Sequence, residues 1–235
     1  MAVDQHVRLL LFVPPGTSLD AFTPGVAEAC QQMTTQITSR VIEKSDLEMV
    51  AATEPRSAFA ETFRLLAVNV ESLAVSQQTQ VILVMSAYPK EGRTTTVVNL
   101  GQSLAELGHR VVIVQSDLPT QNGKGKDDLK KPGLLAGPAI GKPIVPGTMM
   151  PLNVTGGNPA AMKELLATLR PLTDFILLDS PACLQQADAF VLAPLVDGVI
   201  YVVRQRRHDV AAQRDIQAQL ARLGVRVLGA VFNEA

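Results

Sequence analysis

Short apolar runs alternate with longer amphipathic segments from residue 54 to the C-terminus. The runs are rich in Val, Ile and Leu, which is typical of strands buried on both faces. They cover Val81–Met85, Arg110–Gln115, Phe175–Leu178, Gly198–Val203 and Val225–Phe232. Apolar residues recur at spacings of three and four from Phe59 to Leu73, which predicts a helix beginning near Glu54. This alternation predicts an α/β doubly wound fold, with a mostly parallel sheet and helices on both faces.

Two sections depart from the alternation. Residues 1–50 predict one strand over Val7–Val13 and a helix within Pro24–Val41. We expect this section to be an N-terminal extension, either an extra element of the main sheet or a small separate lobe, ahead of a domain over residues 51–235. Gln121–Met150 is rich in Gly, Pro and Lys with little periodicity, which predicts a loop of low order.

Composition narrows the class of protein without naming a ligand. The 235 residues, 47% of them hydrophobic, suffice for one sizeable core. The net charge of -1 gives no general attraction to nucleic acid. No apolar run approaches the ~20 residues of a membrane helix, and the spacing of Cys30 and Cys183 favours reduced thiols. We therefore expect a cytoplasmic protein without direct membrane insertion, held at the inner face of the membrane through a partner.

The segment between the first predicted strand of the main domain and the next helical pattern has the spacing of a P-loop. In the pattern G-x-x-x-x-G-K-[ST], backbone N–H groups wrap the phosphates, the Lys neutralises them, and the Ser or Thr binds Mg²⁺. Here Ala87 stands in place of the first Gly and Arg93 in place of the Lys. The residues predicted to bind the nucleotide here are Glu91, Gly92, Arg93, Thr94 and Thr95. The loop predicts an ATP or ADP site with an altered charge.

Two acidic residues follow predicted strands and complement the P-loop hydroxyl. Asp179 ends the strand from Phe175, and Asp117 follows the strand from Arg110. Because parallel strands end at one edge of a sheet, Thr94, Asp117 and Asp179 form a predicted Mg²⁺ site, with Arg93, Asp117 and Asp179 as the catalytic set. Each residue alone has a simpler interpretation, such as a turn, a helix cap or a solvated charge. Their joint placement favours a nucleotide site, past or present.

Five segments carry motifs that are specific as a set. They are Glu61–Asn69, Ser86–Thr95, Val112–Leu118, Phe175–Pro181 and Gly229–Asn233. They resemble, in this order, the helix E-x-x-R-x-x-R-x-N, the loop S-x-x-P-x-E-G-K-S-T, the strand ending D-x-D, the Walker B strand and the last core strand of the bacterial tyrosine kinases (BY-kinases). This family of capsule and exopolysaccharide synthesis is a branch of the MinD/ParA-type P-loop ATPases. The resemblance implies a P-loop NTPase-type sheet, ATP or ADP with Mg²⁺, and a base-reading role for Asn233.

The sequence also departs from the family pattern at functional positions. Arg93 replaces the phosphate-binding Lys, Gln115 replaces the first Asp of D-x-D, and Ala67 replaces the second Arg of the helix motif that the family uses for ring assembly. A planar guanidinium keeps the charge of Lys but not its point-charge geometry. The tyrosines are Tyr88 and Tyr201 alone, so we expect no phosphorylated Tyr tail unless one was removed.

These departures favour a degenerate BY-kinase-like domain, a pseudokinase with weak or no ATP turnover. We expect it to act as an interaction or regulatory component of capsule or exopolysaccharide synthesis or export. Its expected partner is a protein, either a membrane polysaccharide co-polymerase or a related active kinase, and we expect a monomer or dimer rather than a ring. The alternatives are an active Mg-ATP-dependent ATPase or tyrosine kinase of the same family, and a MinD/ParA-type positioning ATPase, whose additional Lys would fall at Tyr88.

Overall fold

The computed structural model describes residues 57–117, 159–204 and 209–233, together with the backbone of 12–13, 135–136 and 148–155. The strands are β1 Phe12–Val13, β2 Val81–Ser86, β3 Arg110–Asp117, β4 Leu135–Ala136, β5 Thr148–Thr155, β6 Phe175–Asp179, β7 Gly198–Arg204 and β8 Val227–Asn233. The helices are α3 Ala58–Gln77, α4 Arg93–Glu106, α5 Pro159–Leu169, α6 Asp188–Leu192 and α7 Val210–Arg222, with 3-10 turns at Arg170–Leu172 and Ala193–Leu195.

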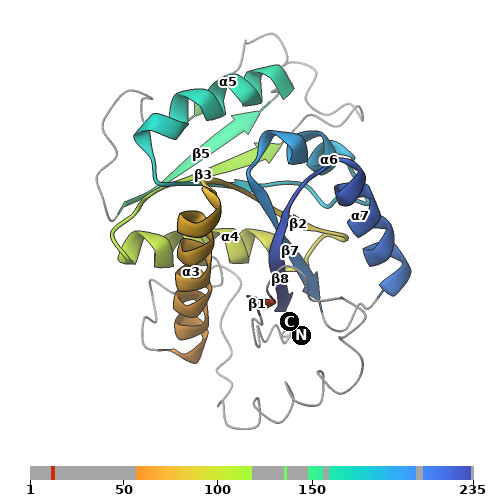
Figure 1. The fold of residues 1–235 in the computed structure, drawn as a ribbon, viewed down its shortest axis with the longest axis horizontal. Helices are drawn as coiled ribbons and strands as arrows, with labels where there is room; N and C mark the ends of the chain where they lie inside the picture. Colours follow the sequence, from red (N-terminus) through yellow and green to blue (C-terminus); the bar gives the residue numbers. More distant parts are fainter. Residues whose placement is uncertain are drawn as a thin grey trace, which may run out of the picture.

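The described strands form one 8-stranded sheet in the order β1-β8-β7-β2-β6-β3-β5-β4. β1 and β4 lie antiparallel at the two edges, and the strands between them pair in parallel. The carboxyl ends of β2, β6, β3, β7 and β8 therefore meet at one edge of the sheet. The order confirms the predicted doubly wound α/β fold, and β2 lies near its centre (Figure 1).

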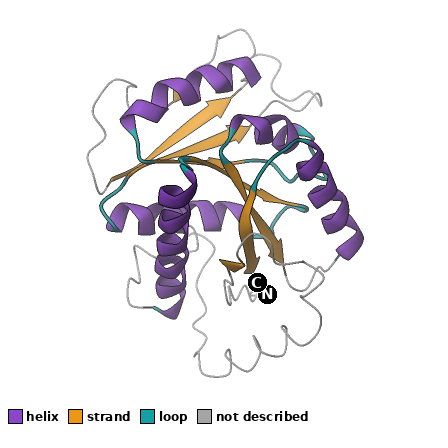
Figure 2. Ribbon diagram, in the orientation of Figure 1, coloured by secondary structure: helices purple, strands orange, loops and turns teal. Residues whose placement is uncertain are grey.

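Helices cover both faces of the sheet, as the buried strands require. Figures 1 and 2 show α3 and α4 on one side of the sheet and α5, α6 and α7 on the other. Alternate residues of each strand enter two separate cores: Val81, Leu83 and Met85 face α5 and α7, whereas Ile82 and Val84 face α3 and α4. This period of two explains why the strands appear as continuous apolar runs in the sequence.

Helix α3 begins at a side-chain cap and packs one apolar face on the sheet layer. The Ser57 hydroxyl accepts from the backbone N–H of Ala60 at 3.1 Å, which satisfies one of the first N–H groups of the helix. The predicted periodic residues Phe63, Leu66 and Val70 are buried against α4 and the strands. The helix therefore begins a turn later than the predicted start at Glu54.

Charged groups fix the amino-terminal ends of the central strands. Asp174 precedes β6, and its carboxylate accepts from the Arg110 backbone N–H at 2.8 Å and from the Arg110 guanidinium at 2.6 and 3.1 Å. Asp197 precedes β7, and its Oδ2 accepts from the backbone N–H groups of Gln80 and Val81 at 2.9 and 2.7 Å. These carboxylates hold the strand starts in register at the end of the sheet opposite the P-loop.

The prediction that Gln121–Met150 forms a loop is wrong in part. Residues 135–136 form β4, and β5 begins at Thr148 and runs parallel to β3. The apolar run of β5 contains Pro151, which argues against a central strand because proline lacks an N–H donor. β4 pairs with β5 only at Asn153 and Val154, so Pro151 has a neighbour strand on one side only within the described residues.

Two further predictions concern the N-terminal section and the membrane. Phe12–Val13 pairs with β8 at the edge of the main sheet, whereas the predicted helix within Pro24–Val41 and the rest of residues 1–50 lie outside the described residues.

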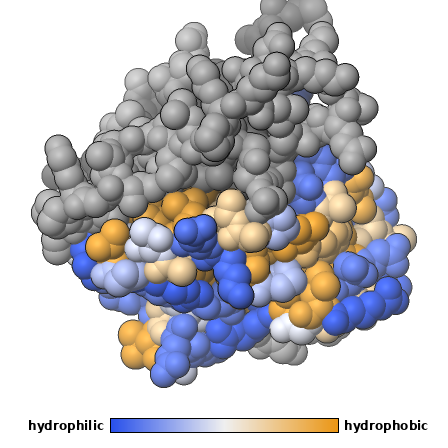
Figure 3. Space-filling model, turned by 90° about the horizontal axis from the view of Figure 1, so that it is seen from above, coloured by the Kyte–Doolittle hydropathy of each residue, from blue (hydrophilic) through white to orange (hydrophobic). Residues whose placement is uncertain are grey.

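In the part of the chain that the structure covers, none of the helices combines the length and the hydropathy of a bilayer crossing. Figure 3 shows apolar patches interspersed with hydrophilic residues on one described face.

We expect Asp174→Asn to lower the free energy of unfolding by about 0.5–1 kcal/mol at pH 7, because the pair is partly exposed and screened by water. Hydrogen bonding by Arg110 holds the pKa of Asp174 below its ordinary value. The carboxylate thus stabilises the fold above its unfolded pKa of about 4, and this contribution disappears as the pH falls through the lower folded value. Urea denaturation from pH 7 to pH 3 measures the difference.

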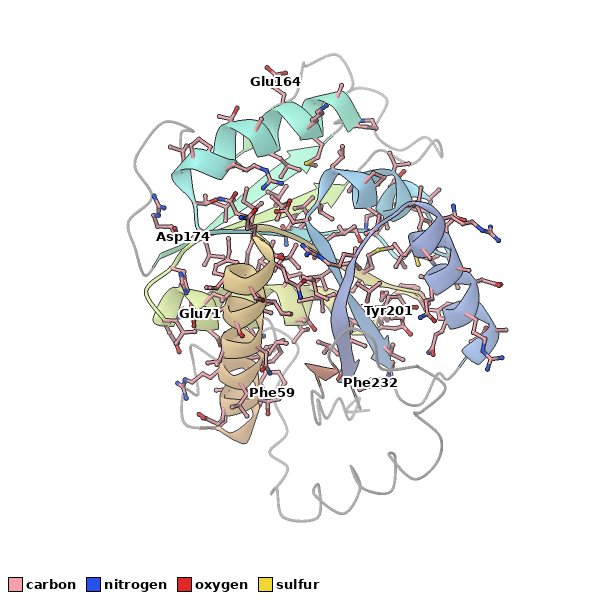
Figure 4. The ribbon with its side chains drawn as sticks, viewed as in Figure 1. Phe59, Glu71, Glu164, Asp174, Tyr201 and Phe232 are labelled. Atoms are coloured by element: carbon pink, nitrogen blue, oxygen red, sulfur yellow. The ribbon has the colours of Figure 1, made fainter. Side chains whose placement is uncertain are left out.

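The matched control is Glu164→Gln on the outward side of α5 (Figure 4), which should match the parent protein at every pH. A deficit in Asp174→Asn that stays constant down to pH 3 would contradict the assigned role of this carboxylate.

Candidate functional site

The loop between β2 and α4 has the backbone of a phosphate-binding turn. Gly92 precedes α4 with φ of 95°, a left-handed conformation that favours glycine. The backbone N–H and the hydroxyl of Thr96 both donate to the Gly92 carbonyl at 2.8 Å. No side chain caps the first turn of α4, so this helix start presents backbone N–H groups of the kind that bind anions.

The loop is also held from inside. Glu91 is 2% exposed, and its Oε2 accepts from the backbone N–H of Tyr88 at 2.9 Å. The Ser86 hydroxyl donates to the Tyr88 carbonyl at 2.9 Å. A buried carboxylate and a buried hydroxyl therefore fix the turn that precedes α4.

Asn233, at the end of β8, holds the loop from the other side. Its Nδ2 donates to the Glu91 carbonyl at 3.0 Å. A Cβ atom built on Gly92 would lie 2.2 Å from the same nitrogen. Gly92 is thus required twice, once for its positive φ and once for the close approach of the Asn233 amide. The sequence resemblance implied that Asn233 reads a base; in this structure its amide contacts the P-loop backbone.

Thr94 and Asp179 meet directly, as expected from the strand ends. The Thr94 hydroxyl donates to Asp179 Oδ2 at 2.7 Å, so Thr94 does not act as a helix cap. Asp179 lies in register with Val84 of β2 and with Gln115 of β3. A hydroxyl and a carboxylate oxygen this close are the donors that Mg²⁺ prefers. The pair therefore fits a magnesium ion bound at this strand edge.

The Arg93 side chain is anchored on the backbone that follows β6. Its guanidinium Nη1 donates to the backbone carbonyl of Ser180, directly after β6. Burial lowers the pKa of Arg93 below its ordinary value, and the negative charge of Asp179 opposes that shift. The side chain is therefore not a freely solvated charge: it joins the start of α4 to the end of β6.

The other predicted site residues lie as follows. The Thr95 carbonyl accepts from Asn99 Nδ2 at 2.8 Å, one turn along α4. Asp117 is the last residue of β3, but its side chain lies outside the described residues, so its predicted role at Mg²⁺ stays a prediction. Among the described residues, no group of three or more His, Cys, Asp or Glu side chains gathers as a metal site.

Two hydrogen bonds behind the loop were not predicted from the sequence. The Tyr88 hydroxyl donates to Asp209 Oδ2 at 2.8 Å, and Asp209 Oδ1 caps α7 by accepting from the Ala212 N–H at 3.0 Å. The backbone N–H of Cys183 donates to the Ser86 carbonyl at 3.0 Å. Burial raises the pKa of the Cys183 thiol to about 11 and also raises the pKa of Tyr201. Neither contact has a sequence signal, because each joins residues about a hundred positions apart.

A P-loop-like turn after a central strand, with an acidic residue at the end of the neighbouring strand β6, is typical of the P-loop NTPase fold. No family model matches the chain. The tyrosine-protein kinase YwqD of Bacillus subtilis is 29% identical over 205 residues, which cover 79% of this chain and 85% of YwqD. The succinoglycan biosynthesis transport protein ExoP of Rhizobium meliloti is 26% identical over 218 residues, covering 80% of this chain but only 26% of ExoP.

Solved structures of kinase domains have a similar fold. The VpsO kinase domain is 26% identical with a TM-score of 0.56, covering 75% of this chain and 96% of that domain. The kinase domain of the Escherichia coli tyrosine kinase ETK has the same fold, with a TM-score of 0.62 at 18% identity over 78% of each chain. The chain is therefore similar in sequence and fold to the BY-kinases, a branch of the P-loop ATPases.

We expect Gly92→Ala to destabilise the fold more than Gly108→Ala does. Both glycines have φ of 95°, but a Cβ on Gly108 meets nothing within 4 Å. Gly108→Ala should therefore lower the free energy of unfolding by about 1–2 kcal/mol through the backbone alone. Gly92→Ala should lower it by a further ~1–3 kcal/mol, because the Asn233 amide must move. Urea denaturation of both variants measures the gap.

The same pair in an Asn233→Ala background separates the two causes. Without the amide, the gap between Gly92→Ala and Gly108→Ala should close. A gap that persists would mean that Asn233 does not restrict this turn.

Proposed function

We propose that this chain is a BY-kinase-type domain with weak or no ATP turnover, acting as an interaction or regulatory component of a capsule or exopolysaccharide synthesis or export system. The main support for weak or absent ATP turnover is the position of Arg93. Phosphoryl transfer needs a positive charge positioned at the transferred group. In this chain the equivalent cation is anchored on the Ser180 carbonyl.

A second support is the residue beside Asp179. Gln115 of β3 lies in register with Asp179, at the position where the family pattern has an acid. An amide carries no charge, so it supports neither a metal ion nor an attacking hydroxyl as a carboxylate does. Losing one preorganised charged group typically lowers the rate by ~10²- to 10³-fold. Two such losses leave little turnover.

The biological setting follows from the named relatives. YwqD is a tyrosine-protein kinase and ExoP a succinoglycan biosynthesis transport protein. The match covers only 26% of ExoP, so the whole of that protein contains much beyond this domain. We propose that this chain works with a protein of that kind, a membrane polysaccharide co-polymerase or a related active kinase, at the inner face of the membrane.

A working Mg-ATPase is the second candidate, favoured by one observation. Thr94 and Asp179 keep their contact at 2.7 Å, and their oxygens fit Mg²⁺. When Mg-ATP is bound, the ion would neutralise charge on its terminal phosphates. Thr94 and Asp179 would hold the ion, the N-terminus of α4 would bind the phosphates, and Arg93 would supply the remaining positive charge.

Phosphate release from MgATP separates the two candidates. We expect the parent protein to release phosphate no faster than Asp179→Ala, and Arg93→Lys alone to stay at that level because Gln115 remains. The double variant Arg93→Lys with Gln115→Asp should exceed the parent by about 100-fold or more.

Glu164→Gln is again the matched surface control, and circular dichroism confirms that each variant folds. Phosphate release by the parent protein that disappears in Asp179→Ala would overturn the proposal in favour of the active enzyme.

For assembly we propose a monomer or a dimer rather than a ring. Ala67 of α3 stands where the family helix motif has its second Arg, and it is 0% exposed, packed into the core against α4 and the sheet. A buried methyl group cannot form an ion pair with a neighbouring subunit. Sizing with light scattering should therefore give one or two chains per particle, and a stable octamer would contradict this expectation.

A further inference from the structure

Tyr88 holds a phenol hydroxyl at the surface of the loop between β2 and α4, and nothing in the ATP chemistry above uses it. Its aromatic ring is partly buried and packs against the core cluster that contains Ile216 of α7. Its hydroxyl donates to Asp209 Oδ2 at 2.8 Å in a contact that solvent reaches. The fold therefore anchors the ring and presents the hydroxyl in one orientation.

The other tyrosine among the 235 residues lies in a different environment. Tyr201 is part of β7, is 5% exposed and packs in the core cluster between the sheet and α7, as Figure 4 shows. Burial raises the pKa of its hydroxyl. An enzyme that modifies tyrosine hydroxyls can therefore reach Tyr88 in the folded chain but not Tyr201.

The backbone of Tyr88 is fixed separately from its side chain. The Tyr88 N–H donates to Glu91 Oε2 at 2.9 Å. The Tyr88 carbonyl accepts from the Ser86 hydroxyl at 2.9 Å. A chemical change at the phenol oxygen therefore acts on the side-chain contact with Asp209 and leaves these two backbone contacts in place.

Asp209 joins this loop to α7 with its two carboxylate oxygens. Oδ2 accepts from Tyr88, and Oδ1 caps α7 by accepting from the Ala212 N–H at 3.0 Å. These hydrogen bonds, the one from Ala212 first, hold the pKa of Asp209 below its ordinary value. The carboxylate is therefore negatively charged at neutral pH. One charged group thus contacts both the phenol and the first turn of α7.

We propose that Tyr88 is a phosphorylation site and that its phosphate releases the Tyr88–Asp209 contact. The phosphate donor is ATP, and the enzyme is an active protein-tyrosine kinase. The Tyr88 oxygen forms a bond to the γ-phosphorus, the bond from that phosphorus to the bridging oxygen breaks, and ADP leaves. The phenol proton passes to the base of the kinase and then to solvent. The inference rests on the proposed function in one respect, because that kinase is the related active kinase proposed above as a partner.

Release of the contact follows from the charge and the lost proton. A tyrosine phosphate ester has no hydroxyl hydrogen, so Tyr88 can no longer donate to Asp209. It also has a charge of about -1.5 to -2 at pH 7, which repels the Asp209 carboxylate. Because Asp209 is the N-cap of α7, its displacement weakens the first turn of that helix. Phosphorylation would thus separate the nucleotide loop from α7.

Residue-level mass spectrometry tests the site. The parent protein is incubated with MgATP, with and without YwqD, the tyrosine-protein kinase of Bacillus subtilis. We expect phosphate on Tyr88 when YwqD is present, none in Tyr88→Phe and an unchanged amount in Tyr201→Phe. A synthetic peptide covering Val84–Thr94, which contains Tyr88 alone among the tyrosines, is incubated in parallel.

Phosphate on Tyr201, or none on Tyr88 of the folded chain, overturns the inference, and labelling of the peptide alone would show that the fold withholds Tyr88. A different result would overturn the proposed function instead. If Tyr88 is labelled without YwqD and Asp179→Ala abolishes that labelling, the chain itself transfers phosphate, while Tyr88 remains the site.

Hydrogen exchange of the Ala212 amide tests the release of the contact. We expect exchange to be about 3- to 10-fold faster in the phosphorylated protein than in the parent, the size of effect that loss of a helix cap gives. Asp209→Asn is the matched control, because Asn caps a helix as well as Asp does but has no charge for the phosphate to repel. Phosphorylation should leave its exchange unchanged. Equal acceleration in Asp209→Asn, or none in the parent chain, would contradict the release.

Discussion

The candidate site of this protein depends on the contact between the start of α4 and the end of β6. Thr94 donates to Asp179 at 2.7 Å, and Arg93 donates to the carbonyl of Ser180. The contact exists because β2 and β6 are parallel neighbours whose carboxyl ends meet. The buried strands place these ends, and the carboxylates of Asp174 and Asp197 fix the opposite ends. The fold thus brings two side chains of α4 to the end of β6.

The same contact can keep the Mg²⁺ donors together and still weaken the phosphate site. The oxygens of Thr94 and Asp179 fit Mg²⁺, but Arg93 uses its guanidinium to join α4 to β6. Around them the turn is held by Glu91, by Asn233 and by the contact of Tyr88 with Asp209. These contacts fix the shape of the loop from several sides.

The sequence predicted the parts that depend on local periodicity and on strand ends. The buried strands are continuous apolar runs, and the meeting of Thr94 with Asp179 follows from parallel topology alone. The sequence did not predict β5, because Pro151 interrupts its apolar run. It also did not predict the anchoring of Arg93, because Ser180 accepts through its backbone carbonyl, a group that every residue has. The contact between Tyr88 and Asp209 also needed the structure, because it joins residues that are far apart in the sequence.

The most direct test of the central claim is calorimetric titration of the parent protein with ATP and ADP, with and without Mg²⁺. If Arg93 is committed to Ser180, both nucleotides bind weakly, with dissociation constants of about a millimolar or no measurable heat, which corresponds to about -4 kcal/mol or less favourable. Micromolar binding of ATP that requires Mg²⁺ and disappears in Thr94→Ala would contradict the account, because it would show a phosphate site that Arg93 serves rather than blocks.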